Sequence, residues 1–110
     1  MSKVLIPLTD KNIATNGYQK LDSGLIIQWG RSNGGSNAVV EGVFTFDFPV
    51  AFPNACLSFV PTDYVSESSA LCTVGAGSNT NATTAEVYYK NDNGNTSANP
   101  GFINWIAIGW

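Results

Sequence analysis

The chain of 110 residues contains no histidine, and this absence excludes several kinds of chemistry. A Ser-His-Asp or Cys-His nucleophile needs an imidazole, and histidine is the usual general base near neutral pH. Zinc sites are built mainly from histidine and cysteine, and only Cys56 and Cys72 are present. We therefore expect no metal, no cofactor and no enzymatic activity.

Cysteine is scarce as well, and two interpretations of the pair remain open. Cys56 and Cys72 either form a disulfide across two strands or stay as small buried hydrophobic residues. The polar start of the chain, MSKVLIPLTDK, does not resemble a secretion signal, so we expect synthesis in the cytoplasm. A cytoplasmic protein is kept reduced, which favours the free thiols.

Charge is low, at 12% of residues against a usual share of roughly 25%. The net charge is −3 and the five basic residues are scattered, so we expect no nucleic-acid partner. No apolar run approaches the roughly 18 residues of a membrane-spanning helix, so we expect no membrane insertion. With 44% apolar residues, this composition indicates a chain that buries surface by assembly.

The apolar pattern contains no helical stripe and predicts an all-β domain. Short alternating runs are separated by clusters of Gly, Pro, Asn and Ser, which is typical of an antiparallel β-sandwich or barrel. We expect residues 1–16 to form a leader and residues 17–110 to form one domain of six to seven short strands. The expected strands are 17–21, 25–29, 39–48, 55–60, 69–74, 84–90 and 102–110.

Three polar loops, 31–38, 62–68 and 91–101, lie at one end of the domain if the strands alternate in direction. A rigid sandwich with clustered polar loops is a common way to build a binding surface. Tyr88 belongs with these loops because it lies on the polar face of its strand, where a ring next to polar groups suits a sugar. The alternative is that Tyr88 packs at a subunit contact. The candidate ligand-binding residues are Arg31, Asn33, Asp63, Tyr64, Glu67, Tyr88, Asn91, Asp92 and Asn93.

Carboxylates in these loops leave one enzymatic alternative. Two acids facing each other can hydrolyse a glycosidic bond, and Asp63, Glu67 and Asp92 are the acids available. Acids in a polar loop are far more often solvated charges or hydrogen-bond acceptors. We therefore expect no release of sugar, and replacement of Asp63 or Asp92 by alanine would test this.

The last strand, FINWIAIGW, has two apolar faces, and a strand in a small sandwich normally hides only one. We expect Ile106 and Ile108 to face the domain core. The other face would then meet further copies of the chain and would carry Ile103, Trp105 and Ala107.

Three motifs together resemble the C-terminal tip domain of phage and prophage tail fibres. They are NGYQKLDSGLIIQWG, FDFPVAFPNAC and the ending FINWIAIGW. The resemblance implies a β-sandwich similar to the H-type lectins, assembled as a homotrimer on a fibre shaft that precedes residues 1–16. It also implies a location in the virion, at the tip of the tail fibre, and binding of a bacterial surface polysaccharide such as lipopolysaccharide. The alternative function is a structural trimerisation cap, with recognition carried by another protein.

The resemblance also places a sugar site, though without a defined specificity. It implies that the loops after GLIIQWG and ACLSFV, with the segment after Tyr88, form the site. Where those lectins have a Trp-His pair, this chain has Tyr89 and Lys90, and Arg31 is its only arginine. No particular sugar is therefore carried over.

Overall fold

The computed structural model describes residues 11–33, 41–64, 72–91 and 102–110. Within these ranges the chain is entirely β, which confirms the predicted fold class, and it contains no helix long and apolar enough to cross a membrane. The strands are β1 (Lys11–Asn12), β2 (Gly17–Lys20), β3 (Ile26–Asn33), β4 (Glu41–Asp47), β5 (Cys56–Tyr64), β6 (Cys72–Ala76), β7 (Thr84–Asn91) and β8 (Phe102–Gly109).

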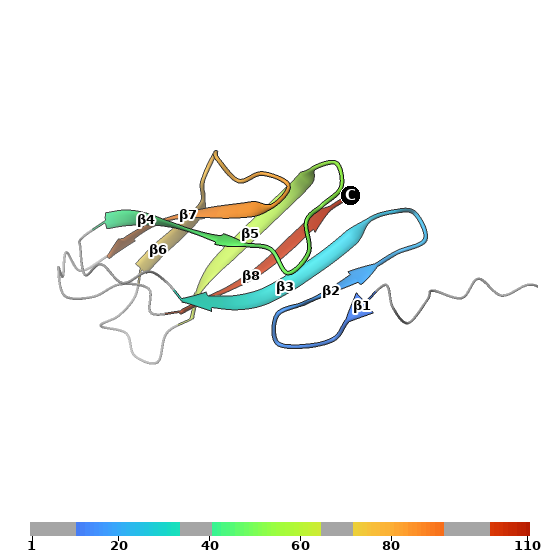
Figure 1. Ribbon diagram of the computed structural model, residues 1–110. Coiled ribbons are helices and arrows are strands. Elements are labelled where there is room, and N and C mark those ends of the chain that lie inside the picture. Colours follow the sequence, from blue (N-terminus) through green and yellow to red (C-terminus); the bar gives the residue numbers. More distant parts are fainter. Residues whose placement is uncertain (1–10, 34–40, 65–71, 92–101) are drawn as a thin grey trace, which may run out of the picture.

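The strands form two antiparallel sheets that pack as a sandwich (Figure 1). The larger sheet has the order β1-β2-β3-β8-β5, and the smaller has the order β4-β7-β6. β8 lies between β3 and β5 and pairs with both along its length. The C-terminal strand is therefore the central element that holds the larger sheet together.

β3 and β5 are both longer than the sequence pattern predicted. Their polar ends, Arg31–Asn33 and Thr62–Tyr64, were expected to be loops, but β8 holds them in ladder pairs. Asn33 and Tyr64 both pair with Phe102. β5 accommodates Pro61 because it is at the edge of its sheet, where a missing N–H can be tolerated.

An eighth strand, β1, lies within the segment that was expected to be a leader. Lys11 and Asn12 pair with β2, and the indole Nε1 of Trp29 donates a hydrogen bond of 2.9 Å to the carbonyl of Ala14. The Asn16 side chain accepts a bond of 2.8 Å from the backbone N–H of Arg31. From Lys11 onward the chain is therefore attached to the larger sheet.

The two sheets enclose a core dominated by aromatic rings. Phe46, Phe48 and Phe59 each contact the Trp105 ring, at centroid distances between 5.2 and 6.2 Å. The predicted alternation of β4 is confirmed, because Phe44 and Phe46 pack against this core together with Phe48. Tilted and edge-on rings of this kind contribute more than their buried area alone.

One buried polar side chain fixes the connection between the sheets. Gln28 is 0% exposed, yet both ends of its amide are bonded to Val50. Its Nε2 donates to the Val50 carbonyl at 2.7 Å, and its Oε1 accepts from the Val50 N–H at 3.0 Å. Gln28 thus substitutes for a strand neighbour and holds the segment between β4 and β5 against β3.

The predicted orientation of the last strand is wrong. Ile103, Trp105 and Ala107, which were expected to meet partner chains, are at most 5% exposed and belong to the domain core. Ile106, which was expected in the core, is 44% exposed, and Ile108 shares its face. The reason is packing, because the Trp105 indole fills the space between the rings of Phe46, Phe48 and Phe59.

Candidate functional site

The ends of the strands that border the three polar loops meet at one end of the sandwich. Asn33, Tyr64 and Phe102 lie side by side in the larger sheet, and Cys72 pairs with Asn91 in the smaller one. A hydrogen bond of 2.8 Å from the backbone N–H of Cys72 to the Asp63 carboxylate joins the two sheets there. The predicted grouping of loop borders is confirmed for these residues.

Arg31 and Tyr64 come together on the outer face of the larger sheet. The guanidinium carbon of Arg31 lies 4.0 Å from the centroid of the Tyr64 ring, within the range of a cation–π interaction. Arg31 Nε also donates to the side-chain oxygen of Asn104 at 3.2 Å. The Arg31 side chain thus reaches across β8 from β3 to β5 and is held in one position.

Asp63 has a structural partner in addition to its place in the predicted site. Its Oδ2 accepts the bond from Cys72, and the side chain is partly buried. A carboxylate that bridges two sheets is held by the fold itself. This contact is a structural reason for an acid at this position, without any reference to catalysis.

The structure leaves several predicted site residues without a described side chain. Asn33 ends β3 and Asn91 ends β7, so each is placed on the backbone at the expected end of the sandwich. Glu67, Asp92 and Asn93 lie outside the described residues.

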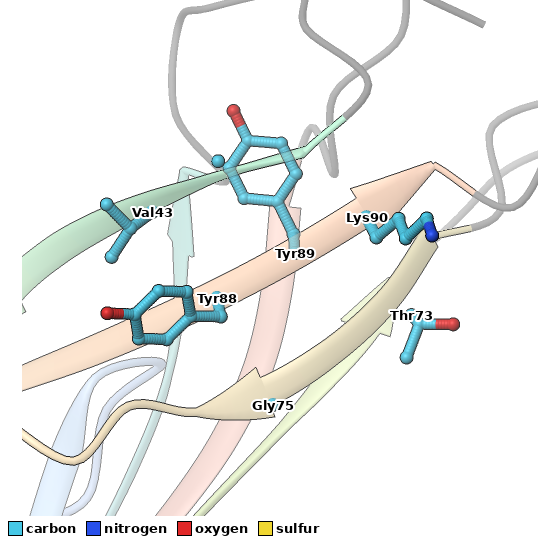
Figure 2. A pocket seen from close by; sticks show the side chains of 7 residues that line it. Val43, Thr73, Gly75, Tyr88, Tyr89 and Lys90 are labelled. Atoms are coloured by element: carbon cyan, nitrogen blue, oxygen red, sulfur yellow. The ribbon is translucent and has the colours of Figure 1, made fainter. Parts of the chain in front are cut away.

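Tyr88 borders a hollow of about 590 Å³ on the smaller sheet (Figure 2). Its neighbours Val87 and Tyr89 point into the core, so the Tyr88 ring lies on the outer face and is 50% exposed. It pairs with Val43 on β4 and with Gly75 on β6. The described lining of the hollow consists of Gly42, Val43, Thr73, Gly75, Tyr88, Tyr89 and Lys90.

Gly75 leaves one side of the Tyr88 ring uncovered. A Cβ at Gly75 would meet no atom within 4 Å, so the space beside the ring is open. Lys90 and Thr73, paired with each other across β7 and β6, supply an ammonium and a hydroxyl on the same face as Tyr88. An open aromatic ring with polar donors nearby is the arrangement that stacks against a sugar and bonds its hydroxyls.

Three of the predicted site residues divide between the two outer faces of the sandwich. Arg31 and Tyr64 lie on the larger sheet, whereas Tyr88 lies on the smaller sheet, with the core between them. One subunit therefore does not bring all of them into a single pocket. Reasoning from the sequence also missed Gly75 and Asn104, whose roles depend on strand register and leave no signal in the residue pattern.

Cys56 and Cys72 do not form a disulfide, as the cytoplasmic interpretation favoured. Cys56 begins β5 and pairs with Gly109, whereas Cys72 is buried and pairs with Asn91 at the other end of the sandwich. Partial burial raises the pKa of the Cys56 thiol, and a backbone hydrogen bond with Ser58 lowers it by less. Among the described residues, no group of three or more Cys, Asp and Glu side chains is placed to hold a metal ion.

Comparison with known proteins identifies the family. Residues 20–110 match the family model described as tail fiber protein gp53-like, C-terminal. The chain belongs to this family of tail fibre C-terminal domains. No curated protein sequence matches it.

Solved tail fibres share both the fold and part of the sequence. An N-truncated R1-type pyocin tail fibre is 32% identical, with a TM-score of 0.75 over 91% of this chain and 84% of that one. A C-terminal part of the R1 pyocin fibre of P. aeruginosa is 33% identical, with a TM-score of 0.74 over 91% of this chain and 27% of that one. An R2-type pyocin fibre, at 22% identity and a TM-score of 0.70, shares the fold.

Proposed function

We propose that this chain is the receptor-binding tip of a phage or prophage tail fibre, which recognises a bacterial surface glycan without catalysis. The observation that carries the proposal is the open ring of Tyr88 beside Gly75 in a domain of the tail fibre family. The glycan is a polysaccharide of the lipopolysaccharide type. The domain lies at the end of a shaft that precedes residues 1–16, on a virion tail that acts outside the host cell.

The proposal includes a homotrimer, and the outer face of the larger sheet is its interface. That face carries large apolar side chains that the domain itself does not cover: Val60, Phe102 and Ile106 are each between 44% and 49% exposed. They are neighbours on β5 and β8 through the pairs Val60 with Ile106 and Tyr64 with Phe102. Covering such a face with further copies removes apolar surface from water at roughly 25 cal/mol per Å².

In a trimer each fibre tip carries three Tyr88 rings on the sheets that face away from this interface. A single aromatic contact is worth about 0.5–1.5 kcal/mol, so each site alone is weak. Linking several sites raises the overall avidity without any new contact. This arrangement suits the capture of a repeating polysaccharide on a cell.

The test uses an array of bacterial lipopolysaccharides and capsular polysaccharides, probed with the purified chain. We expect saturable binding to a subset of them and about a tenfold loss of apparent affinity for Tyr88→Ala, because the stacking surface is removed. Tyr88→Phe, which keeps the ring, should retain most of the binding. Thr45→Ala is the matched control, since Thr45 is exposed on the same sheet and outside the hollow.

The competing function is a structural cap that trimerises the shaft while another protein recognises the host. An intact trimer that binds no polysaccharide on the array would favour the cap and contradict the proposal. Release of reducing ends from a bound polysaccharide would contradict the absence of catalysis. Loss of that release in Asp63→Ala or Asp92→Ala would then assign the activity to these acids.

A further inference from the structure

A second cleft, of about 410 Å³, lies where β3 of the larger sheet faces β4 of the smaller one. Its floor is formed by the rings of Phe46 and Trp105, whose centroids are 5.2 Å apart. Pro49 and several polar or charged residues line the rest of it, among them Asn12 and Asn16 from the N-terminal segment and Ser32 from β3. We refer to it as the Trp105 cleft.

The Trp105 indole carries a hydrogen-bond donor that the fold does not use. Trp105 is 5% exposed, and within the described part of the chain its Nε1 has no acceptor. A buried donor without a partner costs about 1–3 kcal/mol, so such groups call for an explanation. The other two indoles differ, because Trp29 donates to Ala14 and Trp110 is half exposed.

The unused donor lies on the side of the ring next to Gly30, close to the Asn16 side chain. A Cβ built on Gly30 would come within 2.8 Å of Trp105 Nε1, and it would also collide with the Asn16 side-chain oxygen. Gly30 is directly before Arg31 and Ser32 in β3, and Asn16, Arg31 and Ser32 all line the cleft. The nitrogen edge of the indole is therefore beside the cleft wall.

The walls are fixed before any ligand arrives. Asn16 is bonded to the Arg31 backbone, and β1 is paired with β2, so the N-terminal side of the cleft is tied to the sheet. The charged groups at the rim already have partners: Arg31 contacts Asn104 and Tyr64, and Asp47 accepts a bond of 3.1 Å from Thr84. The cleft therefore offers amides, a hydroxyl and aromatic side chains, with Arg31 and Asp47 held at its rim by these contacts.

We propose that the Trp105 cleft binds a single neutral sugar ring as a second glycan subsite of the domain. The apolar side of the ring lies against Phe46 and Trp105, its hydroxyls bond to Asn12, Asn16 and Ser32, and one oxygen accepts the indole N–H. The volume is within the range of small-molecule sites. This inference rests on the proposed glycan recognition, but it places a contact at a site separate from Tyr88, where both sheets contribute to the lining.

The test is a nuclear magnetic resonance titration of the ¹⁵N-labelled chain with D-glucose, D-galactose, L-rhamnose and N-acetyl-D-glucosamine in turn. The three tryptophans give three indole N–H signals, which Trp→Phe variants assign. We expect one of these sugars to shift the Trp105 signal saturably, with a dissociation constant on the order of 1–10 mM, as is usual for one small contact. The Trp110 signal should stay in place.

Variants separate binding in the cleft from a general effect. Ser32→Ala and Asn12→Ala should each raise the dissociation constant of the sugar about fivefold, because each removes one hydrogen bond. Ser58→Ala is the matched control, since Ser58 is a strand serine on β5 outside the cleft. The unshifted indole signals of each variant without sugar report that it is folded.

Absence of a saturable Trp105 shift with all four sugars overturns the proposal, as does an equal, linear shift of all three indole signals. A shift that Ser32→Ala and Asn12→Ala leave unchanged also overturns it. The two proposals fail in distinguishable ways. Polysaccharide binding on the array without a Trp105 shift would contradict the sugar subsite in the cleft and leave the proposed function standing. Absence of polysaccharide binding would contradict the proposed function itself.

Discussion

The two faces of β8 are almost equally apolar, but they have different environments. The inner face carries Trp105 at the centre of the aromatic core, and the outer face carries Ile106, which the domain leaves exposed. Since the two residues are adjacent, a shift of one position would exchange them. The difference shows that hydrophobicity alone does not decide which face of a strand stabilises a domain. Complementary shape across the core decides it.

Replacing the inner side chain should have the largest effect. Trp105→Ala removes the ring that Phe46, Phe48 and Phe59 contact, so we expect the free energy of unfolding to fall by about 3–5 kcal/mol. Urea denaturation followed by circular dichroism measures it. Ile106→Ala is the matched control and should cost the domain itself far less, because the domain leaves nearly half of Ile106 uncovered. Equal losses of unfolding free energy in the two variants would contradict the difference between the inner and outer faces of β8.

A substitution on the outer face of β8 should disrupt the assembly and leave the domain folded. Ile106→Asp places a charge in the proposed interface three times per trimer, so we expect the trimer to dissociate while the β spectrum persists. Sedimentation velocity reports the size of the particle. Val43→Asp, at a similarly exposed position on the smaller sheet, should leave assembly unchanged. Unfolding of Ile106→Asp would mean that this face also belongs to the domain core.

A smaller loss of stability is expected at Gln28, a buried polar residue of β3 that pairs with Ala107 on the inner face of β8. Gln28→Met keeps the volume but leaves the buried N–H and carbonyl of Val50 without their partners. We expect the free energy of unfolding to fall by about 1–3 kcal/mol, measured by urea denaturation. Gln19→Met, at a partly exposed position on β2, is the control. An unchanged stability would show that Val50 finds other partners.

The smallest expected effect is on the alkylation rates of the two thiols. Cys56 and Cys72 differ in burial, like the outer and inner faces of β8. The raised pKa of Cys56 means that less thiolate is present at a given pH than for a free cysteine, so its alkylation by iodoacetamide should be slower at pH 8. The rate should keep increasing with pH beyond the ordinary thiol range. Cys72, which is buried, should react more slowly still. Faster reaction at Cys72 would contradict the burial order.

The alternation of apolar residues was sufficient to predict an all-β sandwich and most of its strands. It could not predict β1 or the polar ends of β3 and β5, because pairing with β8 and β2 holds those residues in strands despite their composition. It could not orient FINWIAIGW either, since both faces fit the pattern equally well. The orientation of the strand depends on its register and on side-chain packing, and the spacing of apolar residues specifies neither.

Part of the candidate site could also be predicted from the pattern of the sequence. The alternating direction of antiparallel strands grouped the borders of the three loops, and the side-chain period of two placed Tyr88 on an outer face. The contact of Arg31 with Tyr64 and the open space beside Gly75 depend on which strands are neighbours. The separation of Arg31 and Tyr88 onto opposite sheets likewise required the sheet order.

The central claim is that the inner face of β8 holds the domain together and its outer face holds the assembly. Light scattering of the unmodified chain over a dilution series measures this most directly. The account predicts a particle of three times the chain mass of 11.7 kDa that persists on dilution. A folded particle of 11.7 kDa at every concentration would contradict it, because the exposed face around Ile106 would then remain uncovered in solution.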